Sequence, residues 1–173
     1  MERGTTIGNQ RIASLFDSGT FVEIGSFMRR SDEELTAAVC GYGAIDGKLA
    51  YAFAQDSDRK KGAFDALQAK KIEMLYKMAL KNGAPVIGVF DSVGAVVSDG
   101  ANALAAYGTL LKAVSEASGV IPQIAVIAGP GILFFMQETL VSTNTAPSCT
   151  RFFCQPFAFF TSYICCMVLR TKK

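Results

Sequence analysis

Histidine is absent from all 173 residues, and this absence limits the chemistry open to the chain. Without an imidazole there is no Ser-His-Asp or Cys-His catalytic pair and no histidine-ligated metal site. The clustered cysteines offer no substitute, because Cys149, Cys154, Cys165 and Cys166 lack the Cys-x-x-Cys spacing of a zinc framework. We therefore expect no metal in this chain, and an enzyme built on it must use other groups.

Strong charge and a leader segment are missing as well. The formal net charge is only +2, and the basic run Arg59-Lys60-Lys61 is too short for a nucleic-acid-binding surface. Residues 1–19 hold no apolar run followed by a small-residue cleavage site, so the sequence predicts no secretory signal. We therefore expect a cytoplasmic protein with no nucleic-acid partner, and its length suits one domain.

Glycine disappears from the last part of the chain. All 16 glycines lie at or before Gly131, whereas seven of the 13 phenylalanines lie after it, and no clear period organises residues 132–173. We expect this tail to be frameshifted or disordered, irregular or an isolated helix, which would leave the strand before it with an unpaired edge. A membrane anchor at 152–169 is the alternative, but the run is short and polar residues interrupt it, so we do not expect membrane association.

The stretch from Gly83 to Gly100, GAPVIGVFDSVGAVVSDG, is the candidate site. An apolar run at 86–90 predicts a buried strand, the polar turn after it contains Gly94, and Ser98 or Asp99 is placed to cap a helix. In open α/β sheets, ligands bind where such strands end and backbone N–H groups face an anion. An ordinary strand-to-helix connection is the alternative interpretation.

Strands and helices alternate along the rest of the chain. Asp46-Gly47 predicts a type I′ hairpin turn, and the strand after it alternates bulky residues with alanine, so that one face lets a neighbouring layer approach closely. We expect a short helix at 9–16, an extended segment at 21–27, a solvated loop at 29–34, strands at 36–45, 49–56, 86–90 and 123–128, and helices at 63–82 and 99–118.

Each long helix has an apolar stripe at helical spacing. The stripe of the first consists of Ile72, Leu75, Tyr76 and Ala79, and that of the second of Leu104, Tyr107, Leu111 and Val114. Such helices cover a sheet, and Asn82-Gly83 supplies a left-handed end for the first. The order of elements predicts right-handed crossovers and a largely parallel sheet, which is an α/β fold.

Several colinear blocks resemble the amino-terminal half of biotin-dependent acyl-CoA carboxyltransferases, the subunits of propionyl-CoA carboxylase and methylmalonyl-CoA decarboxylase. The blocks are FVEIG (21–25), GYGAIDGKLAYAFAQD (41–56), AKKI (69–72), ALKNGAPVIGVFDSVGA (79–95) and SGVIPQIAVIAGP (118–130). So many ordered blocks are more specific than a lone glycine motif. On this resemblance, residues 1–131 are part of an amino-terminal carboxyltransferase domain, and 132–173 are a divergent tail.

The resemblance implies a crotonase-like fold, a spiral of strand-strand-helix repeats, here truncated. It implies carboxyl transfer between biotin on a carrier protein and the α-carbon of a short acyl-CoA. Backbone N–H groups hold the oxyanions and biotin takes the α-proton, so this chemistry needs no histidine. The implied partners are an acyl-CoA, a biotin carboxyl carrier protein and, in the full-length family, further copies of the subunit.

The implied site residues follow from two matched segments. Where the family has Asp-Ser-Gly-Gly-Ala-Arg, this chain has Asp-Ser-Val-Gly-Ala-Val at 91–96, so the backbone N–H groups of Val93 and Gly94, with Ala95 as a near alternative, are the expected oxyanion donors. Where many relatives have a glycine-rich helix start, the residues here are Arg59, Lys60, Lys61, Gly62 and Ala63. These are candidate contacts for the coenzyme A phosphates, and a solvated loop is the alternative.

The chain departs from the family pattern after Gly131, where relatives continue with a glycine-rich helix start. We therefore expect the chain alone to be inactive in carboxyl transfer. A non-catalytic acyl-CoA-binding fragment, membrane-associated through its tail, is the alternative function. A crotonase-type hydratase fits less well, because it places acidic side chains at the acyl group.

Overall fold

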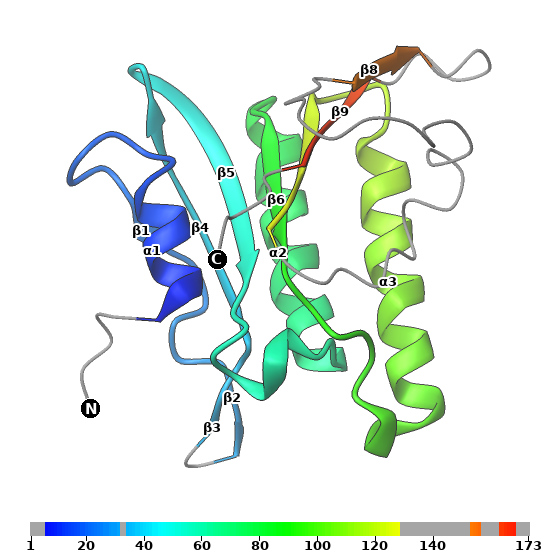
Figure 1. The fold of residues 1–173 in the computed structure, drawn as a ribbon. Helices are drawn as coiled ribbons and strands as arrows, with labels where there is room; N and C mark the ends of the chain where they lie inside the picture. The colour runs from blue at the N-terminus through cyan, green and yellow to red at the C-terminus, as the bar shows by residue number, and fades with distance from the viewer. Residues whose placement is uncertain (1–5, 32–33, 129–152, 157–162, 169–173) are drawn as a thin grey trace, which may run out of the picture.

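The computed structural model describes residues 6–31, 34–128, 153–156 and 163–168 (Figure 1). Its centre is a seven-stranded sheet in the order β1-β4-β5-β6-β7-β9-β8. The bounds are β1 Val22–Glu23, β4 Ala38–Ile45, β5 Lys48–Gln55, β6 Val86–Phe90, β7 Gln123–Ile127, β8 Phe153–Pro156 and β9 Tyr163–Val168. β2 (Arg29–Ser31) and β3 (Glu34–Leu35) form a separate antiparallel pair, so the predicted loop at 29–34 is wrong.

The strands of the sheet run in both directions. β4 and β5 form the predicted hairpin, and both turn residues have positive φ, +50° at Asp46 and +73° at Gly47. β6 then pairs in parallel with β5, and β7 in parallel with β6. The parallel part predicted from the alternating elements is therefore confirmed, and the carboxyl ends of β5, β6 and β7 meet at one edge of the sheet.

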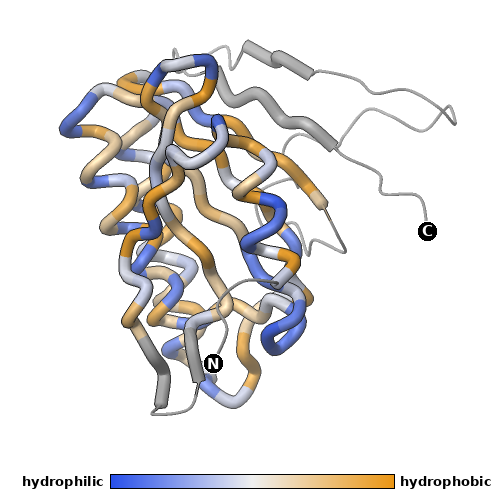
Figure 2. Tube along the Cα trace, turned by 90° about the vertical axis from the view of Figure 1, so that its left-hand side faces the viewer, coloured by the Kyte–Doolittle hydropathy of each residue, from blue (hydrophilic) through white to orange (hydrophobic). Residues whose placement is uncertain are grey.

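Helices cover both faces of the sheet. α1 (Ile7–Ala13) lies on one face, whereas α2 (Ala66–Asn82) and α3 (Ala101–Ala117) lie side by side on the other (Figure 1). Figure 2 shows hydrophobic and hydrophilic colours alternating along the coiled segments, as expected for helices with one buried face. No helix within the described ranges is long and apolar enough to cross a membrane.

The alternation along β5 divides the core into two clusters. Tyr51 and Phe53 face α2 and pack with its predicted stripe, which is fully buried. The alanines at 50, 52 and 54 face α1, where Ile12 and Phe16 pack on them. Small side chains on this face let a short helix lie close to the sheet, as the sequence predicted.

The start of each long helix differs from the prediction. Phe64 forms a β-bridge with Ala95, and the Asp65 carboxylate accepts a hydrogen bond from the Gln68 N–H (2.8 Å), so α2 begins at Ala66 instead of residue 63. Gly83 ends α2 with φ +65°, as predicted. Gly100 is the N-cap of α3 and no side chain caps it, because residues 97–99 form a separate 3-10 turn, so the predicted cap at Ser98 or Asp99 is wrong.

The buried face of α3 also differs from the predicted stripe. Leu104 is 67% exposed, and the buried residues are Ala103, Ala106, Leu110, Ala113 and Ala117. α3 packs against α2, and small side chains allow two helices to approach closely. The predicted stripe is therefore only partly correct: Tyr107 and Val114 are partly buried and pack against the core, whereas Leu104 is exposed.

Further differences concern the first helix, the extended segment that follows it and the tail. The first helix begins at Ile7, with the Thr6 hydroxyl accepting from the Asn9 N–H (3.4 Å), and the extended segment at 21–27 contains only the two-residue β1. The expectation of an unpaired edge at β7 is wrong, because β9 pairs with β7 in parallel and β8 pairs with β9. The tail is therefore not purely irregular or helical. Most of 129–162, including the predicted turn at 129–131, lies outside the described residues.

Because α3 buries Leu110 and exposes Leu104, we expect alanine substitutions of these two leucines to differ in their effect on stability. Leu110→Ala removes a side chain that is only 2% exposed and should lower the free energy of unfolding by about 2 to 5 kcal/mol. Leu104→Ala, the matched control, should change it by less than about 0.5 kcal/mol. Urea denaturation of both variants measures these values, and a larger loss at Leu104 would favour the predicted stripe instead.

Candidate functional site

The turn at 91–96 begins where β6 ends. The N–H of Asp91 donates to the Gln55 side-chain oxygen at the end of β5 (3.1 Å), and the N–H of Gly94 donates to the Ser92 hydroxyl (3.1 Å). Gly94 has φ +112°, a conformation that other residues rarely adopt, whereas Val93 has no positive φ. Valine in place of the family's first glycine is therefore accommodated, because the unusual conformation falls on Gly94.

The loop at 59–63 lies directly against this turn. The Val93 N–H donates to the Lys61 carbonyl (3.2 Å), and the Phe64 N–H donates to the Gly94 carbonyl (2.8 Å). Gly62 has φ +70°, and a side chain there would overlap the Asp91 carbonyl oxygen. The structure thus brings together the two segments that the sequence analysis singled out, although they lie about thirty positions apart in the sequence.

The three predicted oxyanion donors are not equivalent. The N–H groups of Val93 and Gly94 already have partners within the site, as described above. The bridge between Phe64 and Ala95 uses the Gly94 carbonyl and the Val96 N–H (3.0 Å to the Phe64 carbonyl), so it leaves the Ala95 N–H unused. Among the described residues, the Ala95 N–H has no hydrogen-bond partner, and Ala95 is exposed.

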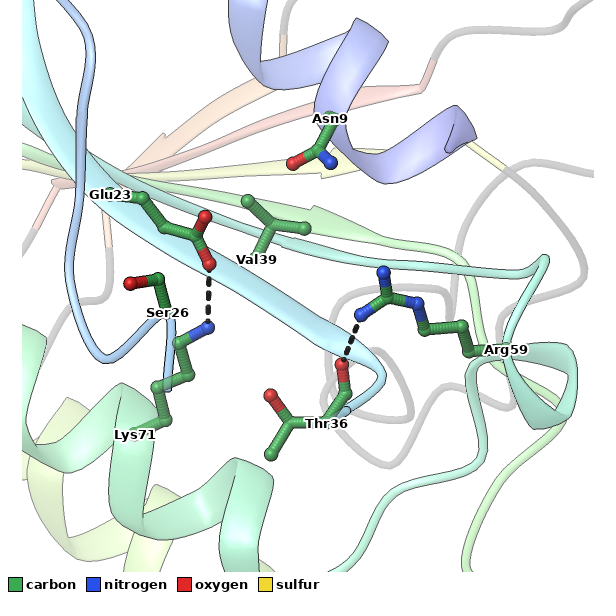
Figure 3. A pocket seen from close by; sticks show the side chains of 7 residues that line it. All are labelled: Asn9, Glu23, Ser26, Thr36, Val39, Arg59 and Lys71. Carbon is green, nitrogen blue, oxygen red and sulfur yellow. Dashed lines mark hydrogen bonds and ion pairs between the residues drawn. The ribbon is translucent and has the colours of Figure 1, made fainter. Parts of the chain in front are cut away.

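The predicted coenzyme A contacts divide into two groups. The Arg59 guanidinium points inward: its Nε lies 3.5 Å from the carboxylate of fully buried Asp56, and its terminal nitrogen Nη1 donates to the Thr36 carbonyl (3.1 Å; Figure 3). Lys60 and Lys61 are exposed beside the turn. Both have left-handed backbone, with φ +46° and +53°, a strained conformation that is common at functional sites.

Gly62 and Ala63 shape the loop, and their N–H groups are already used in hydrogen bonds within it. The Gly62 N–H donates to the Arg59 carbonyl (2.8 Å), and the Ala63 N–H donates to the Lys60 carbonyl (3.0 Å). These bonds fold the loop onto itself, so that its carbonyl at Lys61 faces the turn. Neither N–H is available to an anion in this conformation.

Sequence reasoning missed the polar side chains that tie the site to the sheet. The Arg11 guanidinium, on α1, donates to the Asp91 carboxylate and to the Ala128 carbonyl (3.4 Å). Gln55, at the end of β5, accepts from the Asp91 N–H. Arg11 lies 80 positions from Asp91, so no local motif connects them. Only the fold shows that they meet.

A small polar pocket lies beside the site and shares only Arg59 with it (Figure 3). Its lining residues are Asn9, Glu23, Ser26, Thr36, Val39, Arg59 and Lys71. Lys71 is 2% exposed, pairs with Glu23 (3.2 Å) and donates to the Ala38 carbonyl (2.8 Å). Its charge is therefore compensated within the protein, and the pocket does not include the turn. The described residues contain no group of three or more His, Cys, Asp or Glu that could hold a metal ion.

Comparison with known proteins relates this arrangement to one family. A family model described as a carboxyl transferase domain matches residues 1–132. The alpha subunit of methylmalonyl-CoA decarboxylase from Veillonella parvula is 42% identical over 137 residues, which is 74% of this chain and 27% of that protein. The mitochondrial propionyl-CoA carboxylase beta chain from Homo sapiens is 39% identical over 140 residues, 75% of this chain and 26% of that one.

Solved structures agree with the sequence comparison. The transcarboxylase 12S structure with methylmalonyl-coenzyme A and methylmalonic acid bound matches with a TM-score of 0.68 and 33% identity, over 72% of this chain and 26% of that one. The beta subunit of geranyl-CoA carboxylase from P. aeruginosa matches with a TM-score of 0.63 and 27% identity, over 72% and 24%. The chain thus spans about a quarter of the length of the curated relatives it matches.

Because Gly62 lies against the Asp91 carbonyl, we expect two glycine substitutions to lower the free energy of unfolding by different amounts. Gly83→Ala places a side chain at φ +65° in open space, so only the backbone strain of about 1 to 2 kcal/mol is expected. Gly62→Ala adds an overlap with the Asp91 carbonyl, so it should lower the free energy of unfolding clearly more than Gly83→Ala does. Chemical denaturation of both variants measures the difference, and equal losses would mean that the loop does not rest on the turn.

The buried thiol of Cys40 leads us to expect a loss of stability at alkaline pH. Burial raises the pKa of its thiol from 9.0 to about 12, against the opposing charge of Lys71. Between these values the thiol ionises only in the unfolded chain, so its contribution is complete below pH 9 and is lost as the pH rises towards 12. Cys40→Ala should flatten the fall in unfolding free energy between pH 9 and 11, and an unchanged slope would contradict this assignment.

Proposed function

Because the chain belongs to the carboxyl transferase domain family, we propose that it supplies the thioester-binding part of an acyl-CoA carboxyltransferase. The reaction moves a carboxyl group between biotin on a carrier protein and the α-carbon of a short acyl-CoA. The family membership and the crotonase-like α/β fold are shown by the comparisons. The substrate, the carrier protein and the assembly into oligomers are proposals, since the chain spans only about a quarter of its relatives.

The Ala95 N–H, which has no hydrogen-bond partner among the residues that the structure describes, carries the proposal. Thioester chemistry at the α-carbon places negative charge on the carbonyl oxygen, and a backbone N–H already fixed in position stabilises that charge without reorganisation. Ala95 lies in the turn that follows the carboxyl end of the parallel strand β6, and ligands bind at such strand ends in α/β sheets. Its N–H is the donor, whereas the N–H groups of Val93 and Gly94 hold the turn in shape.

The loop beside the turn provides for the coenzyme A portion. Lys60 and Lys61 are exposed next to Val93, and their ammonium groups suit the phosphates of the substrate. Arg59 pairs with Asp56 and holds the loop in place, so we assign the phosphate contacts to the two lysines. The transcarboxylase that this chain resembles has methylmalonyl-coenzyme A bound, which supports a substrate of the same class here.

Removing the Ala95 donor tests the proposal. Ala95→Pro has no N–H and should weaken binding of propionyl-CoA by up to about tenfold, the contribution of one hydrogen bond. Ala95→Gly keeps the N–H and should bind as the unmodified chain does. Free coenzyme A has no thioester oxygen, so its binding should be equal in all three proteins. Isothermal titration calorimetry measures these affinities, and unchanged propionyl-CoA binding by Ala95→Pro would place the donor elsewhere.

The alternative, an acyl-CoA-binding fragment without catalysis, predicts the same binding but no chemistry. Catalysis is tested by incubating the chain with propionyl-CoA and a carboxylated biotin carrier protein and following transfer of the labelled carboxyl group. Transfer would establish the enzyme. Binding without transfer would agree with the alternative and with the inactivity expected from the sequence.

A further inference from the structure

We infer that Arg11 is a positioning residue for the candidate site, which it reaches from the opposite face of the sheet. This inference rests on the proposed function, because it concerns the turn assigned to the thioester. Arg11 lies on α1, whereas α2 and α3 cover the other face (Figure 1). Its guanidinium makes two contacts, one to the Asp91 carboxylate and one to the Ala128 carbonyl.

The two contacts join the ends of neighbouring strands. Asp91 is the first residue after β6, and Ala128 is the first residue after β7. The Ala128 N–H also donates to the Phe90 carbonyl (3.0 Å), so the two strand ends are already adjacent when Arg11 bridges them. A planar guanidinium can hold two acceptors in a fixed geometry, which the single ammonium of lysine cannot do.

Burial makes the contact to Asp91 strong. The Asp91 side chain is 7% exposed and that of Arg11 is 23% exposed, so water screens this pair less than a surface pair. The Asp91 N–H is held at the same time by Gln55 at the end of β5. Residue 91 is therefore held through both its backbone and its carboxylate at the point where the turn leaves the sheet.

The turn itself contains no basic residue that could pair with Asp91, because residues 92–96 are Ser, Val, Gly, Ala and Val. Arg11 supplies a guanidinium to the start of the turn from α1. Without it, buried Asp91 would lose its charged partner, and the turn would relax to restore hydration of the carboxylate. The bonds from Val93 and Val96 to the neighbouring segment would then open.

Hydrogen exchange of the full chain tests this directly and needs no ligand. In Arg11→Met, the amides of Val93, Gly94 and Val96 should exchange about tenfold faster than in the unmodified chain, because a charge-assisted hydrogen bond is lost. Amides in the middle of α2 should not change. Lys112→Met removes a charge from an exposed pair on α3 and serves as the matched control. Unchanged exchange in the turn of Arg11→Met would overturn the inference.

A second readout separates positioning from a general loss of stability. The bound thioester carbonyl of propionyl-CoA labelled with carbon-13 should show a shifted resonance in the unmodified chain, because a fixed N–H polarises it. In Arg11→Met the bound resonance should move towards the free value while free coenzyme A still binds, and in Arg11→Lys it should be intermediate. A purely structural role would reduce the bound fraction but leave the bound resonance where it was, which would contradict positioning.

Two further outcomes have defined meanings. If Arg11→Met does not fold, Asp91→Asn removes the charge pair with little change of volume, and faster exchange at Val93 and Val96 supports the inference while normal exchange overturns it. If the unmodified chain does not bind propionyl-CoA, the proposed function fails for this chain. The exchange experiment still decides whether Arg11 holds the turn.

Discussion

The backbone contact between the loop at 59–64 and the turn at 91–96 is the interaction on which the site depends. It uses the Lys61 carbonyl and the Val93 N–H at one end and the bridge between Phe64 and Ala95 at the other. The contact needs glycine at position 62, since any side chain there would overlap the Asp91 carbonyl. Because the bridge uses neighbours of Ala95, it fixes that residue without occupying its N–H.

The sheet determines where this contact forms. β5 and β6 are parallel neighbours, so the segments that follow them leave the same edge side by side. Buried Gln55 and Asp91, together with half-buried Arg11, then tie the ends of β5, β6 and β7 together. Buried hydrogen-bonded networks of this kind rigidify a structure when every member has a partner. The rigidity is what a preorganised oxyanion site requires.

The sequence predicted the elements whose signals are local. The run at 86–90, the Asp46-Gly47 turn and the glycine end of α2 each follow from a few adjacent residues, and the structure has all three. The prediction from the sequence failed where the burial of a residue depends on which element packs against it. Leu104 belongs to a regular apolar stripe, but it is exposed, and only Tyr107 and Val114 of that stripe pack against the core. The most buried face of α3 consists of four alanines and Leu110.

The candidate site shows the same division. The resemblance singled out both segments, but only the structure shows that the N–H groups of Val93 and Gly94 already donate to the Lys61 carbonyl and the Ser92 hydroxyl. It also shows that Arg59 faces Asp56 and that Arg11 reaches Asp91 across 80 positions. No spacing rule contains this information. The pairing of β9 with β7 was missed because residues 132–173 carry no period that predicts a strand.

The central claim is that the Ala95 N–H, and not its two neighbours, faces the thioester oxygen. Titration of the nitrogen-15-labelled chain with propionyl-CoA, and separately with free coenzyme A, tests this claim most directly. We expect the Ala95 amide resonance to move with propionyl-CoA and much less with coenzyme A, while the amide resonances of Val93 and Gly94 move little. An Ala95 resonance that stays in place when propionyl-CoA binds would contradict it.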